Sequence, residues 1–64
     1  MTPTEVKQAA DEMVEVFGPY MAIEHCKRVI EELEELDSNM KKFRIVAKIQ
    51  KYRLILSELE GRVK

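Results

Sequence analysis

Four cations in the C-terminal part of the chain have the spacing of a ligand-binding row. They are Lys41, Arg44, Lys48 and Lys51, at intervals of 3, 4 and 3 residues. On a helix this spacing puts the four side chains on one face. Cations in such a row can contact successive phosphate groups, which makes binding to nucleic acid strongly salt-dependent. Binding of phosphate, a nucleotide or nucleic acid by this basic stripe is therefore one hypothesis.

An acidic run offers the same basic stripe a partner within the protein. Residues 1–37 carry ten acidic and three basic side chains, whereas residues 38–64 carry two acidic and eight basic ones. An antiparallel hairpin or a dimer would bring the two signs together, and such pairs can set orientation and partner choice. Because the whole chain has a net charge of −1, it has no general attraction to nucleic acid, so we prefer this pairing. The acidic run consists of Glu31, Glu32, Glu34, Glu35 and Asp37.

His25 and Cys26 are neighbours whose side chains could in principle bind a metal or act in catalysis. Adjacent positions on a helix point about 100° apart, so the two side chains do not converge on one ligand. Cys26 also lies in the middle of an apolar stripe, where it acts as a small hydrophobic residue. The glutamate runs lack the Glu-x-x-His pattern of di-metal helical bundles. We therefore expect no enzyme activity, no catalytic residues, no metal site and no cofactor.

Capping residues and periodicity predict three helices, near residues 3–17, 20–36 and 40–60. Thr2 is suited to cap the first helix, with Pro3 at its first position and Glu5 completing a capping box. Gly18-Pro19 ends that helix, and Pro19 can begin the next. The apolar residues recur at three- and four-residue intervals, without the alternation of a strand. The chain is thus predicted to be one all-α domain, residues 1–64, with a helical hairpin and a long C-terminal helix.

The remaining boundaries and the core follow from the same patterns. We expect Asp37-Ser38-Asn39 to form the second loop and to cap the third helix, which ends at Gly61. The predicted apolar face of the first helix is Val6, Ala9, Ala10, Met13, Val14 and Phe17. That of the second helix is Ala22, Ile23, Cys26, Val29, Ile30, Leu33 and Leu36.

The third helix has two apolar seams, although a helix with one partner needs only one. The first seam consists of Ile45, Ile49, Tyr52, Leu56, Leu59 and Val63, with the spacing of a coiled coil. The second seam lies almost opposite and consists of Phe43, Ala47, Gln50, Leu54, Ser57 and Gly61. We expect one seam to pack within the chain and the other to meet a second subunit or a target protein. A looser core wrapped around this helix is the alternative. The expected interface residues are Phe43, Ala47, Leu54, Ile45, Ile49, Tyr52 and Leu56.

The size of the chain favours self-association. A chain of 64 residues has a small core, and its single cysteine excludes an internal disulfide. We therefore expect a homo-oligomer, with a dimer favoured. No apolar segment approaches the length of a membrane span, and residues 1–5 lack the basic and apolar regions of a signal peptide. We therefore expect a soluble, cytoplasmic protein without a membrane partner.

The pattern Val-x-x-Phe-Gly at residues 14–18, followed by Ala22, Cys26, Ile30 and a Leu-Glu-Glu-Leu ending, resembles small uncharacterised helical proteins of gut bacteria and their phages. The resemblance covers about residues 5 to 37. It implies an accessory protein that acts by binding, for example as an inhibitor of a host system. We therefore expect a small helical protein-interaction module of the adaptor or inhibitor type, with phosphate or nucleic-acid binding as the alternative.

Overall fold

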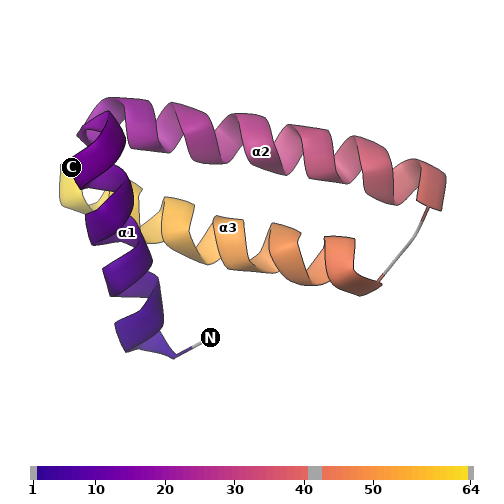
Figure 1. Cartoon of the computed structure of the whole chain (residues 1–64), viewed down its shortest axis with the longest axis horizontal. Helices are drawn as coiled ribbons and strands as arrows, with labels where there is room; N and C mark the ends of the chain where they lie inside the picture. The colour runs from indigo at the N-terminus through magenta and orange to yellow at the C-terminus, as the bar shows by residue number, and fades with distance from the viewer. Residues whose placement is uncertain (1, 41–42, 64) are drawn as a thin grey trace.

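The computed structural model describes residues 2–40 and 43–63, which form three α-helices (Figure 1). They are α1 (Pro3–Phe17), α2 (Pro19–Met40) and α3 (Phe43–Val63). No strand occurs in these two described ranges. The structure therefore confirms the prediction of an all-α fold with three helices.

Both ends of α1 have the predicted caps. The hydroxyl oxygen of Thr2 accepts a hydrogen bond from the backbone N–H of Glu5 at 3.2 Å, and Pro3 occupies the first helical position. At the other end Gly18 has φ 85°, a conformation that side chains with a Cβ rarely adopt. The N–H of Gly18 donates to the carbonyl of Val14 at 2.8 Å, and Pro19 begins α2. A single residue therefore joins the two helices.

The predicted boundary between the second and third helices is wrong. Helix α2 continues beyond Leu36 to Met40, so Asp37-Ser38-Asn39 is helical and forms neither a loop nor an N-cap. The segment contains no Gly or Pro that would stop the helix, and the hydroxyl of Ser38 donates to the carbonyl of Glu34 at 3.2 Å. Helix α3 begins at Phe43 and includes Gly61, which was predicted to lie beyond its end.

Helices α2 and α3 lie side by side and antiparallel, as a hairpin (Figure 1). Helix α1 crosses this hairpin at one end, where α2 begins and α3 ends, and contacts both helices. The other end of the hairpin, with the last turns of α2 and the first turns of α3, extends beyond α1. The molecule measures 33 × 23 × 20 Å along its principal axes.

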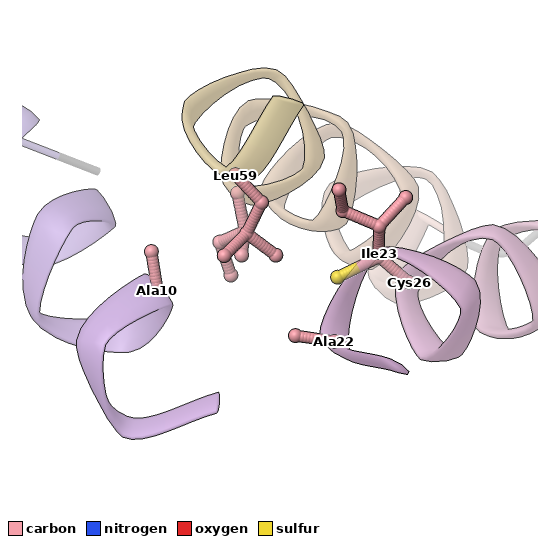
Figure 2. Close-up of a cluster of buried hydrophobic side chains, with 6 residues drawn as sticks. Ala10, Ala22, Ile23, Cys26 and Leu59 are labelled. Atoms are coloured by element: carbon pink, nitrogen blue, oxygen red, sulfur yellow. The ribbon is translucent and has the colours of Figure 1, made fainter. Parts of the chain in front are cut away.

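The core lies where the three helices meet. Figure 2 shows side chains from all three helices converging there. Ala10 and Ala22 are fully buried, and their small side chains let α1 approach the hairpin closely. Ile30 and Ile49 are also buried, but they lie outside this main cluster, farther along the hairpin. The main cluster consists of Ala10, Ala22, Ile23, Cys26, Ile55 and Leu59.

Candidate interaction surface on the third helix

The described part of the basic stripe is exposed and unpaired. Arg44, Lys48 and Lys51 are exposed, and none of them has a carboxylate within 4.0 Å among the residues that the structure describes. Lys41 was predicted to belong to the stripe, but it lies outside the described residues. Within a single chain the structure thus leaves these three cations available to a ligand.

A different cation connects α3 to the acidic run on α2. The guanidinium of Arg53 donates to a carboxylate oxygen of Glu34 at 2.9 Å, and both side chains are largely exposed. The hairpin therefore brings opposite charges together, as expected for an antiparallel pair. It does so through Arg53 and not through the basic stripe.

The C-terminal end of α3 is tied to α1 by a second cation. One guanidinium nitrogen of Arg62 donates to a carboxylate oxygen of Asp11 at 2.6 Å, and the other donates to the carbonyl of Lys7 at 3.4 Å. Arg62 also lies 3.8 Å from the carboxylate of Glu58, one turn earlier on α3. These contacts hold the last turn of α3, including Gly61, against α1.

The first seam of α3 faces the core. Ile49 is buried, Ile45 is half-buried, and Tyr52 and Leu56 pack against the main cluster. These four predicted interface residues are therefore occupied by packing within one chain. Self-association through α3 therefore has to use other residues of this helix, unless the packing of these four residues rearranges.

Ile55 is the core residue that the sequence patterns missed. It is 1% exposed but belongs to neither seam. The reason is that α3 contacts two helices, α2 and α1, so its buried face is wider than one coiled-coil seam. Ile55 and Leu59 lie in the cluster that α1 also enters through Ala10. The sequence carried one signal for Ile55: the apolar residues of α3 cover more of the helix circumference than the first seam alone.

The second seam faces away from the core. Phe43 is 84% exposed and Leu54 is 49% exposed, while Ala47 and Gln50 between them are also exposed. A shallow hollow on this surface is lined by Ala47, Gln50 and Leu54 together with the stripe residues Lys48 and Lys51. The second seam and the basic stripe thus lie next to each other on the surface of α3.

His25 and Cys26 have separate packing roles. The imidazole of His25 stacks on the ring of Phe17, with ring centroids 4.7 Å apart and an interplanar angle of 19°. The thiol of Cys26 is buried and lies 3.5 Å from the sulfur of Met13. Burial raises the pKa of this thiol, because the thiolate would lose its hydration. A raised pKa lowers the reactivity expected of a nucleophilic cysteine.

Three further exposed apolar side chains, not predicted from the sequence, lie near the junction of α1 and α2. Val16, Tyr20 and Met21 are exposed there, outside the apolar faces of their helices.

Across the two described ranges, no group of three or more His, Cys, Asp or Glu residues could hold a metal ion. None of the helices, within the described residues, is long and apolar enough to cross a membrane.

The sequence matches no protein-family model, no curated protein and no solved structure. What the surface of α3 binds therefore has to be inferred from its geometry and charge.

Proposed function

We propose that the chain is a cytoplasmic protein-interaction module without chemistry of its own, which self-associates through α3 and acts as an adaptor or inhibitor. The observation that carries this proposal is the outward second seam, with Phe43 and Leu54 exposed on either side of Ala47. Exposed apolar side chains on a helix are favourable to bury against a second helix, and the small Ala47 permits close approach. The resemblance of residues 5 to 37 to small proteins of gut bacteria and phages supports an accessory role of this kind.

The charge of α3 predicts how salt would affect this self-association. Arg44, Lys48, Lys51 and Arg53 all lie on the same helix. Two α3 helices that pack together would bring like charges into proximity, which opposes association. Salt screens this repulsion, with a Debye length of about 10 Å at 0.1 M. We therefore expect the oligomer to become tighter as salt concentration rises.

Light scattering at micromolar concentration tests the proposal directly. A dimer mass is expected for the wild-type chain, and Leu54→Glu is expected to yield a monomer, because it places a charge in the apolar contact. Val16→Glu is the matched control, since Val16 is an exposed apolar residue on α1 and its change should leave the mass unaltered. A monomer mass for the wild type at all concentrations, with unfolding independent of concentration, would refute self-association.

The exposed and unpaired basic stripe supports a second candidate function, the binding of nucleic acid or a nucleotide. Its salt dependence has the opposite sign, because binding to phosphates releases counterions and weakens as salt rises. Titration of the chain with a single-stranded oligonucleotide across a salt series is the measurement. Micromolar binding that is lost in the double variant Lys48→Glu with Lys51→Glu would favour this second function. No binding at low salt would exclude it.

A further inference from the structure

Helix α1 covers only one end of the side of the hairpin on which it packs. Fifteen residues separate His25, which stacks on α1, from the end of α2 at Met40. At 1.5 Å per residue this segment of α2 is about 22 Å long, and the segment of α3 from Phe43 to Lys51, where α1 begins to cover it, is about 12 Å long. A helix with its side chains is about 10 Å across. The uncovered part of this side therefore has room for one more helix next to α1.

One edge of this uncovered part belongs to α2. Phe17 of α1 stacks on His25, so His25 marks the face of α2 that points toward α1. Glu32 and Leu36 follow seven and eleven residues later, close to two and three turns, and thus lie on the same face beyond α1. Leu36 is 45% exposed and Glu32 is exposed.

The opposite edge belongs to α3 and is basic. Lys51 lines a shallow hollow together with Ala9, Glu12 and Val16 of α1, so it lies on the α1 side of the hairpin. Lys48 and Arg44 precede it by three and seven residues, close to one and two turns. Both residues therefore lie on the same side of α3 as Lys51, beyond the part of the hairpin that α1 covers. Both are exposed.

An apolar floor lies between the two edges. Around the axis of α2, Leu33 lies between the exposed Leu36 and the buried Ile30. Around the axis of α3, Ile45 lies between the exposed Lys48 and the buried Ile49. Both Leu33 and Ile45 are half-buried, so part of their apolar surface remains open to solvent.

We propose that this surface, the open face, binds an amphipathic helix of a partner protein that has acidic residues beside its apolar side. The open face consists of Glu32, Leu33, Leu36, Arg44, Ile45 and Lys48. This inference rests on the proposed role as an interaction module, but it does not depend on self-association through the second seam. Binding of an amphipathic helix in an apolar groove is a common mode of peptide recognition.

The molecule itself contains a helix of this kind on the same side of the hairpin. Helix α1 is amphipathic, carries Glu5, Asp11, Glu12 and Glu15 against the single Lys7, and packs with its apolar side on α2 and α3. Its Glu12 and Lys51 of α3 line the same hollow, without an ion pair between them. The cations Arg44 and Lys48 continue the basic edge farther along the hairpin, where no acidic residue of the described chain pairs with them.

A peptide with the sequence of residues 2–18 is the probe, because it has the composition that the open face is proposed to accept. Fluorescence anisotropy of the labelled, end-blocked peptide would measure its binding to the full chain. We expect Leu36→Glu, and separately Arg44→Glu with Lys48→Glu, to weaken binding at least about tenfold. Tyr20→Glu, an exposed residue of α2 outside the open face, should leave binding unchanged. Circular dichroism of each variant checks that it folds.

Four results would overturn the proposal. One is no binding of the peptide at millimolar concentration, and a second is equal binding of a scrambled peptide of the same composition. A third is binding to the Leu36→Glu variant at wild-type strength, which would assign the peptide to another surface. The fourth is a lower oligomer mass for Leu36→Glu in light scattering, because the open face would then be occupied by a second copy. The mass of the Leu54→Glu variant separately tests self-association.

Discussion

At the scale of single residues, Cys26 provides a titration that reports on folding. Its raised pKa means that the folded chain holds the thiol proton more tightly than the unfolded chain does. This contribution to stability is complete below the unfolded pKa of about 8.5 and is lost as pH rises through the folded pKa. We expect the free energy of unfolding in urea to decrease above pH 8.5 in the wild type. A Cys26→Ala variant with the same decrease would contradict this origin.

Arg62 is expected to contribute more than Arg53, although both form surface ion pairs. The side chain of Arg62 is 33% exposed and bonds to both Asp11 and a backbone carbonyl, whereas that of Arg53 is 62% exposed and has one partner. We expect Arg62→Ala to destabilise the fold by up to about 1 kcal/mol and Arg53→Ala by less. Urea unfolding of the two variants at low and high salt measures the difference. Equal losses for both would show that the lower exposure of Arg62 and its additional contact with Lys7 add nothing beyond the ion pair.

At the scale of helices, the two glycines should respond in opposite ways to the same substitution. Gly18 has φ 85°, so Gly18→Ala forces a Cβ into a left-handed conformation and should cost roughly 1–2 kcal/mol. Gly61 lies inside α3 with open space around its Cβ position, so Gly61→Ala should stabilise by about 0.5–1 kcal/mol. Urea midpoints of both variants, at unchanged slope, are the measurement. A gain in stability for Gly18→Ala would contradict the junction geometry.

The difference between these glycines also explains which boundaries the sequence could predict. Gly18 stands before Pro19, and the two together stop α1 whatever surrounds them. Gly61 and Asp37-Ser38-Asn39 are weaker signals, which neighbouring contacts override. The ion pairs of Arg62 hold the helix around Gly61, and the bond from Ser38 to Glu34 lets α2 continue. Strong local caps were therefore predictable. The end of α3 was not, because it depends on Asp11 of α1, and the end of α2 was not, because its polar residues also fit a helix.

At the scale of the whole molecule, the positions of the charges on each helix were predictable but their partners were not. The sequence indicated a basic stripe and an acidic run, and the preferred interpretation paired them within a hairpin or a dimer. In the described chain, Arg53 and Arg62 form the ion pairs to α2 and α1, while Arg44, Lys48 and Lys51 remain unpaired. The partner of Arg62 depends on where α1 crosses the hairpin, and that of Arg53 depends on how α2 and α3 are aligned. Neither arrangement leaves a signal in the spacing of the cations.

The crosswise position of α1 has a consequence for hydrogen exchange. Helix α1 joins the hairpin through one residue, Gly18, and enters the main cluster with the small Ala10. Helices α2 and α3 contact each other along most of their length and can stay together when α1 detaches. We expect the amides of α1 to exchange with deuterium as one cooperative unit, through an opening of lower free energy than global unfolding. Amides near Ile30 and Ile49 should exchange last, and Arg62→Ala should accelerate exchange in α1 and in the last turn of α3 but not in the rest of the hairpin.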